Sequence, residues 1–175
     1  MHYLHKILVK VAPELDREEK IKEARSTAVS ETECFYEYVW DWRETESAGR
    51  WAYEYPLNVI LAEDNVDKFL DHLQRCKQMQ LDTVSDDMKS IGEGDLFKMI
   101  QESKFEEIYN RGFFTPFGLD LWKFHRIINL LSGEYIPDSY FFNVDDRDSR
   151  ITDELIEKIK KSPKEYALVL FDQHI

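Results

Sequence analysis

The sequence has few of the residues that mark secreted, membrane-spanning or zinc-binding proteins. Its 175 residues include only two cysteines, Cys34 and Cys76, which are far apart and lack the close spacing of a metal site. We interpret them as the reduced thiols of an intracellular protein. No apolar run approaches 18 residues, which excludes a membrane-spanning helix. The first residues lack the basic start and apolar stretch of a secretory signal, so we expect a cytoplasmic protein.

Positive charge is also scarce. Lys and Arg number 23 against 35 Asp and Glu, which gives a formal net charge of -12. Residues 14–46, 63–110 and 138–157 hold most of the excess acid. Non-specific binding to nucleic acid or to an anionic membrane requires a positive surface, so neither is expected. An acidic surface favours a protein partner, and a basic one in particular.

The apolar and aromatic content is sufficient for a core. Hydrophobic residues make up 43% of the chain and aromatic residues 14%, so we expect one domain spanning residues 1–175. Apolar periodicity predicts the elements. Strands are expected at 2–11, 35–42, 57–62, 139–144 and 166–172, and helices at 14–33, 66–91, 116–131 and 152–161, with one or two shorter helices within 96–108.

This order of elements predicts an α+β fold. We expect a mixed, largely antiparallel sheet of about five strands with helices packed on it. The helices within about 95–133 form an insertion between the two halves of the sheet. The sequence does not determine the order of the strands.

Known catalytic fingerprints are missing. The chain has no glycine-rich phosphate loop, no G-x-S-x-G nucleophile motif and no H-E-x-x-H zinc motif. No serine or cysteine has a recognisable base partner, and the many carboxylates single out no catalytic pair. The sequence therefore predicts no cofactor, and it leaves open whether the protein is an enzyme.

Aromatic residues are concentrated between residues 35 and 55, where eight of them lie within 21 positions. They either fill the core under a helix or form a recognition surface. The block is acidic, which argues against nucleic acid as its ligand. It contains the candidate ligand-binding residues Trp40, Asp41, Trp42, Arg43, Glu44, Arg50 and Trp51. Arginine suits a bidentate contact to an acid or a phosphate, but the same residues can also form a loop held by arginine–carboxylate pairs.

The histidines provide one metal hypothesis. His2 and His5 lie on the first predicted strand, and Asp172 and His174 follow the last. If these strands are neighbours, the four side chains form a ligand set for a divalent transition metal. Against this, His2 and His5 point to opposite faces of their strand.

Several segments carry a resemblance to other proteins. They are HYLHKILV, DWRETESAGRW, EYPLNVILAEDNVDKF, DSYFFN and ALVLFDQH. These segments resemble an uncharacterised protein family of Gram-positive bacteria and their mobile elements. The resemblance implies a bacterial cytoplasmic setting. The family has no assigned activity, so it implies no role for any residue.

Three functions fit these observations. The first is a non-catalytic acidic interaction or accessory protein of a bacterial system, which includes a mimic of DNA if its carboxylates lie in regular rows. The second is a metal-dependent hydrolase that uses the His and Asp residues at the chain ends. The third is a small-molecule-binding protein that uses the loop from Asp41 to Glu44 with Arg50.

Overall fold

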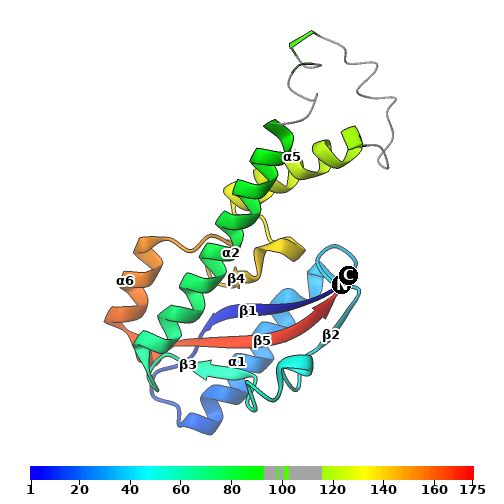
Figure 1. The fold of residues 1–175 in the computed structure, drawn as a ribbon. Helices are drawn as coiled ribbons and strands as arrows, with labels where there is room; N and C mark the ends of the chain where they lie inside the picture. The colour runs from blue at the N-terminus through cyan, green and yellow to red at the C-terminus, as the bar shows by residue number, and fades with distance from the viewer. Residues whose placement is uncertain (93–97, 99–100, 103–115) are drawn as a thin grey trace.

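A computed structural model describes residues 1–92, 98, 101–102 and 116–175 (Figure 1). These residues form an α+β fold, as predicted. The helices are α1 (Arg17–Thr32), α2 (Val66–Gly92), α5 (Pro116–Ser132) and α6 (Asp153–Lys161), and the strands are β1 (His2–Lys10), β2 (Trp42–Glu44), β3 (Val59–Leu61), β4 (Phe141–Asn143) and β5 (Tyr166–His174). The shorter helices expected within 96–108 lie largely outside the described residues. No described helix is long and apolar enough to cross a membrane.

The five strands form one mixed sheet with the order β2–β5–β1–β4, and β3 pairs with β5 beside β2. β1 and β5 are antiparallel over their full length, from His2 opposite His174 to Lys10 opposite Tyr166. β4 is parallel to β1, whereas β2 and β3 are antiparallel to β5. The first and last strands are therefore the two central strands. The start of β1 and the end of β5 lie side by side at one end of the sheet.

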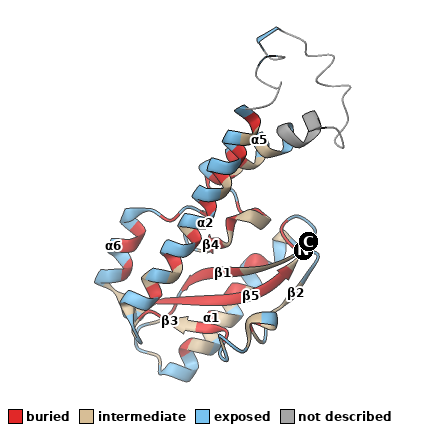
Figure 2. Ribbon diagram, in the orientation of Figure 1, coloured by how far each residue is buried: buried red, intermediate tan, exposed pale blue. Residues whose placement is uncertain are grey.

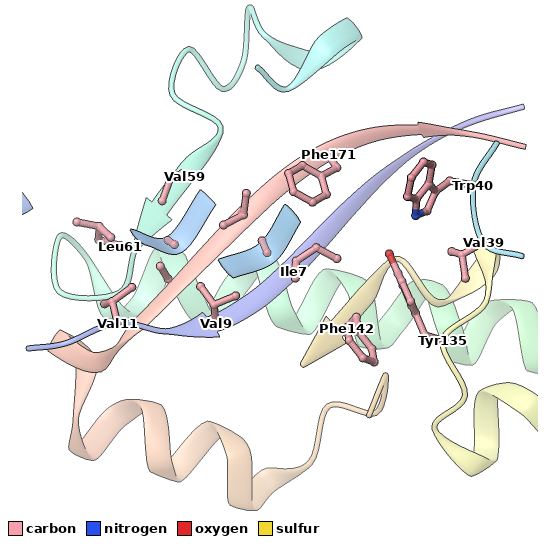
Figure 3. Packing of buried hydrophobic residues seen from close by; sticks show 14 residues of the cluster. Ile7, Val9, Val11, Val39, Trp40, Val59, Leu61, Tyr135, Phe142 and Phe171 are labelled. Carbon is pink, nitrogen blue, oxygen red and sulfur yellow. The ribbon is translucent and has the colours of Figure 1, made fainter. Parts of the chain in front are cut away.

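Helices cover both faces of the sheet, so alternate residues of β1 enter two separate cores. Ile7 and Val9 pack with Phe171 on the side of α1 (Figure 3). Leu8 and Leu168 pack with residues of α2 and α6 on the other side. The central strands are buried along most of their length (Figure 2). This burial fixes the register, because a shift of one residue would exchange the two faces.

α2 is longer than the sheet and continues past it. Its second half pairs with α5 to form a projection, which we call the arm (Figure 1). The two helices run antiparallel, since Lys123 bonds Ser90 and Arg126 bonds Asp87. A third apolar cluster joins them, made of Val84, Ile91, Ile127, Leu130 and Ile136.

The strand predicted at residues 35–42 is wrong. Residues Glu33–Phe35 form a 3-10 turn, and Glu37 has a left-handed φ of 65°. The chain closes on itself here, because Glu37 N–H donates to the carbonyl of Trp40 at 2.8 Å. Val39 and Trp40 are adjacent and both lie in the core on the side of α1, whereas neighbouring residues of a strand face opposite sides. Only Trp42–Glu44 joins the sheet.

His72 of α2 is half-buried. Its Nδ1 atom is buried and has no hydrogen-bond partner among the described residues. The ring contacts Tyr55, with 5.7 Å between ring centroids. Partial burial lowers the pKa of His72, which favours the neutral ring.

Candidate functional site

Two histidines lie side by side where β1, β5 and β2 end. The register places His2 and Trp42 on either side of His174. His2 Nδ1 is 2.7 Å from an Asp172 oxygen, and His174 Nδ1 is 2.8 Å from an Asp41 oxygen. The two rings have centroids 4.9 Å apart. We call these two histidine–aspartate units the histidine pair.

The carboxylate of Asp172 is held from a second direction. The residue is 1% exposed, and its other oxygen accepts the Arg50 backbone N–H at 3.0 Å. Gly49 makes this approach possible, since a Cβ at that position would lie 2.4 Å from the same oxygen. Its φ of +53° also favours glycine. The DWRETESAGRW loop is thereby fixed to the end of β5.

In each unit the carboxylate orients its imidazole. A histidine that donates its Nδ1–H to a carboxylate presents Nε2 as a base or a metal ligand. The hydrogen bond from His174 lowers the pKa of Asp41 and keeps that carboxylate ionised. The histidine pair therefore has the local chemistry of an oriented base.

Only part of the predicted metal set converges. His2, Asp172 and His174 lie together, but His5 is on the opposite face. Its Nδ1 lies 2.7 Å from the Tyr135 hydroxyl, and its Nε2 lies 2.9 Å from the Pro137 carbonyl. Burial lowers the pKa of His5 to about 3. Both ring nitrogens are occupied, so His5 is not a ligand here. Within the described ranges no three His, Cys, Asp or Glu side chains are placed to hold a metal ion.

Arg43 is turned away from the histidine pair. Its guanidinium stacks on the Trp40 ring, 4.0 Å from the centroid, and pairs with Glu33 at 2.6 Å. It also donates to Thr32 Oγ1 at the end of α1. Glu44 accepts backbone N–H groups of its own loop. These contacts fit the alternative in which the predicted ligand-binding loop is held by arginine–carboxylate pairs.

The aromatic block between residues 35 and 55 divides between core and surface. Trp40 is 6% exposed and belongs to the core on the side of α1. Trp51 packs at the edge of the opposite core. Trp42 is half exposed beside His2, and Tyr38 and Tyr53 are exposed as well. Some aromatic residues of this block therefore fill the core, whereas others are exposed and available for recognition.

A cavity of about 300 Å³ lies between α5, the start of β1 and the 3-10 turn Pro137–Ser139. We call it the arm pocket. Tyr3, Tyr38 and Trp122 contribute aromatic rings to it, and Arg126 and Asp138 contribute charges. The sequence does not indicate this pocket, because its residues come from five separate segments. Its only local signal is the spacing of Trp122 and Arg126 by four residues, which places them on one side of a helix.

Negative charges outnumber positive charges around the arm pocket. Arg126 makes two hydrogen bonds of 2.7 Å to Asp87 and lies 3.3 Å from Asp138. Its guanidinium also stacks on Trp122 at 4.2 Å. The hydrogen bonds and the negative charges raise the pKa of Arg126, despite its partial burial. The negative charge of Glu134 reaches Tyr38 and helps raise its pKa. Two carboxylates thus pair with one guanidinium, and a third acts on Tyr38 at the pocket wall.

The opposite side of α5 carries a row of partly exposed apolar side chains. They are Leu121, Ile128 and Leu131, which are 39%, 48% and 57% exposed. We call this row the arm stripe. Leu81 borders it from α2 and shares with Leu131 a shallow groove of about 140 Å³.

Comparison of the chain with protein-family models, with curated proteins and with solved structures gave no match.

Proposed function

We propose that this chain is a non-catalytic interaction protein that binds a basic protein partner through the arm stripe. The expected setting is the bacterial cytoplasm. The observation that supports this most directly is the apolar row along α5. A contiguous exposed apolar surface is uncommon on a monomer and is typical of an interaction site.

The position of the stripe on α5 supports this proposal. Ile127 and Leu130 face α2 and are 7% and 5% exposed, which is sufficient to hold the helix on the arm. The residues of the stripe are thus not needed for that packing. Fully burying a large apolar side chain contributes about 1.5–3 kcal/mol. Leu121, Ile128 and Leu131 are 39%, 48% and 57% exposed, so covering each of them contributes roughly half of this.

The net charge determines which partner we propose. Two copies of this chain would bring together two bodies of charge -12 each. Their mutual repulsion disfavours a homodimer, because a high net charge keeps proteins apart. A basic partner reverses this effect and associates faster.

Photo-crosslinking from the stripe tests the proposal. A photoreactive amino acid replaces Ile128 in one version of the full chain and Tyr53, which is fully exposed, in a control version. We expect position 128 alone to crosslink, in extract of the source cells, to a protein of positive net charge. The purified complex should weaken as salt rises, because ions screen exposed charges.

Three outcomes would reject this function. They are equal crosslinking from both positions, a partner of negative charge, or crosslinks only between copies of this chain. The last would identify the stripe as a homodimer surface.

The histidine pair supports a second candidate, a metal-dependent hydrolase. Carboxylates that orient histidines through Nδ1 are common around metal ligands and acid–base groups. Zinc titration with His2→Gln and His174→Gln variants tests it. Binding of one zinc ion per chain that both substitutions abolish would support this function. Unchanged zinc binding in the variants, or none in the wild type, would reject it.

A further inference from the structure

We propose that the arm pocket receives one arginine side chain of the basic partner, with the guanidinium against the carboxylate of Asp138. This inference depends on the proposed function, because it names the contact by which the same partner is recognised. The pocket suits this side chain in its charge, its wall chemistry, its size and its position.

The charge of the pocket favours a cation. Arg126 is the one basic residue that lines it, apart from the imidazole of His125. Asp87 and Asp138 already pair with this guanidinium, and Glu134 adds a further negative charge nearby. With histidine neutral, the surroundings are net negative. An anionic ligand would be repelled by this excess of negative charge, whereas a second cation would balance it.

Asp138 is free to accept from a ligand. One of its oxygens lies 3.3 Å from Arg126, and the structure records no hydrogen bond to the other from any described residue. The side chain is 14% exposed, so water only partly screens its charge. Its charge is among the causes that raise the pKa of Tyr3 and Tyr140. These two hydroxyls therefore stay protonated beside it.

The walls suit a guanidinium better than an ammonium. Tyr3, Tyr38 and Trp122 present ring surfaces, and a planar guanidinium stacks on aromatic rings while it donates to a carboxylate. The partial exposure of Tyr38 and Trp122, 50% and 39%, leaves these rings open to a ligand. The arm already contains one such contact, since Arg126 stacks on Trp122.

Size and position connect the pocket with the arm stripe. A volume of about 300 Å³ is at the lower end of ligand sites, which suits a single side chain. Residues advance by about 100° along a helix, which places Trp122, Arg126 and Asn129 on one side of α5 and the stripe on another. The ridge between them includes His125. A partner that straddles this ridge reaches both surfaces at once.

A peptide titration of the full chain tests the pocket separately from the stripe. The probe is Ac-Gly-Arg-Gly-NH2, followed by NMR of the tryptophan indole N–H signals, with Trp122 assigned from a Trp122→Phe variant. We expect the Trp122 signal to shift and saturate with a Kd of about 1–10 mM. The same peptide with lysine should bind more weakly. The peptide with citrulline, which is uncharged, should not bind.

Two variants and one control locate the contact. Asp138→Asn should weaken arginine binding at least about tenfold, the equivalent of one charge-assisted hydrogen bond. Tyr38→Ala should weaken it as well, and because Tyr38 is 50% exposed this substitution should leave the fold intact. Asp86→Asn removes the same charge from an exposed position of α2 outside the pocket and should bind as the wild type does.

The result separates this inference from the proposed function. Equal shifts with citrulline, no saturable shift at about ten times the expected Kd, or wild-type binding by Asp138→Asn would overturn the pocket. If crosslinking from Ile128 to a basic partner persists in that case, the proposed function stands without the pocket. If the peptide binds but Ile128 gives no such crosslink, the arginine site stands and the stripe fails as the docking surface. If Asp138→Asn also weakens the crosslinked complex, both stand.

Discussion

Protonation of His5 provides a quantitative test of the packing at the start of β1. The ring is fully buried, and burial lowers its pKa from 6.5 to about 3. Between these values the unfolded chain binds a proton and the folded chain does not. The stability that the neutral ring contributes is therefore complete above pH 6.5 and is lost as the pH falls.

The size of the effect at pH 5 follows directly. That pH lies about 1.5 units below the unfolded pKa, and each unit corresponds to about 1.4 kcal/mol, so the loss is about 2 kcal/mol. This figure depends on the unfolded pKa and the chosen pH. The folded pKa enters only at more acidic pH, because it is well below 5.

Urea unfolding followed by tryptophan fluorescence measures this loss. The wild type is compared at about pH 7.5 and pH 5 with His5→Gln, whose amide still offers an acceptor to Tyr135 and a donor to the Pro137 carbonyl. We expect the wild type to lose about 2 kcal/mol more than this variant on acidification. The exposed His125, replaced by Gln, serves as a control that should follow the wild type. Parallel pH curves for the wild type and His5→Gln would refute the argument.

Three further substitutions test the packing by urea unfolding. Gly49→Ala should destabilise the fold by about 2 kcal/mol or more, since the left-handed backbone costs 1–2 kcal/mol and the new Cβ meets Asp172; an unchanged midpoint would contradict the close approach. Leu130→Ala should cost about 2–5 kcal/mol, whereas Leu131→Ala should stay within about 0.5 kcal/mol, because only Leu130 is buried; equal effects would show that the stripe is packed. Asp172→Asn should cost about 1–3 kcal/mol, because the amide cannot accept both hydrogen bonds; wild-type stability would show that these bonds contribute little.

Local patterns explain which elements the sequence predicted well. α2 and α5 show clear helical periodicity, because one side of each is buried against a neighbour. α6 begins directly after Thr152, where the predicted helix starts, and the Thr152 side chain accepts the Leu155 N–H. β1 and β5 contain the alternating or continuous apolar residues of central strands. In each case the residues of one helix or strand are sufficient to predict its type.

The prediction of a strand at residues 35–42 was wrong for a physical reason. Its aromatic residues alternate as in a strand, but a 3-10 turn and the left-handed Glu37 turn the chain back on itself. The aromatic residues alternate here because only some of the rings in this compact turn reach the core. The alternation does not come from the pleated backbone of a strand. Nothing in the local sequence separates the two cases.

The candidate sites show where local information ends. The sequence predicts that His2 and His174 meet if β1 and β5 are neighbours, and the observed register places them opposite each other. The sequence does not predict that Asp41 is the partner of His174, because the two residues are 133 positions apart. The arm pocket has the same origin, since Tyr3 and Trp122 meet only through the strand order and the arm.

The central position of β5 has a consequence for the synthesis of the protein. β1 leaves the ribosome early, but its main partner emerges more than 150 residues later. At a rate of 5–20 residues per second, β1 waits roughly 10–30 s for the strand that completes the sheet. During this time its apolar residues have no permanent cover, and the long loop to be closed slows folding further. The sheet should therefore form only after translation has passed residue 174.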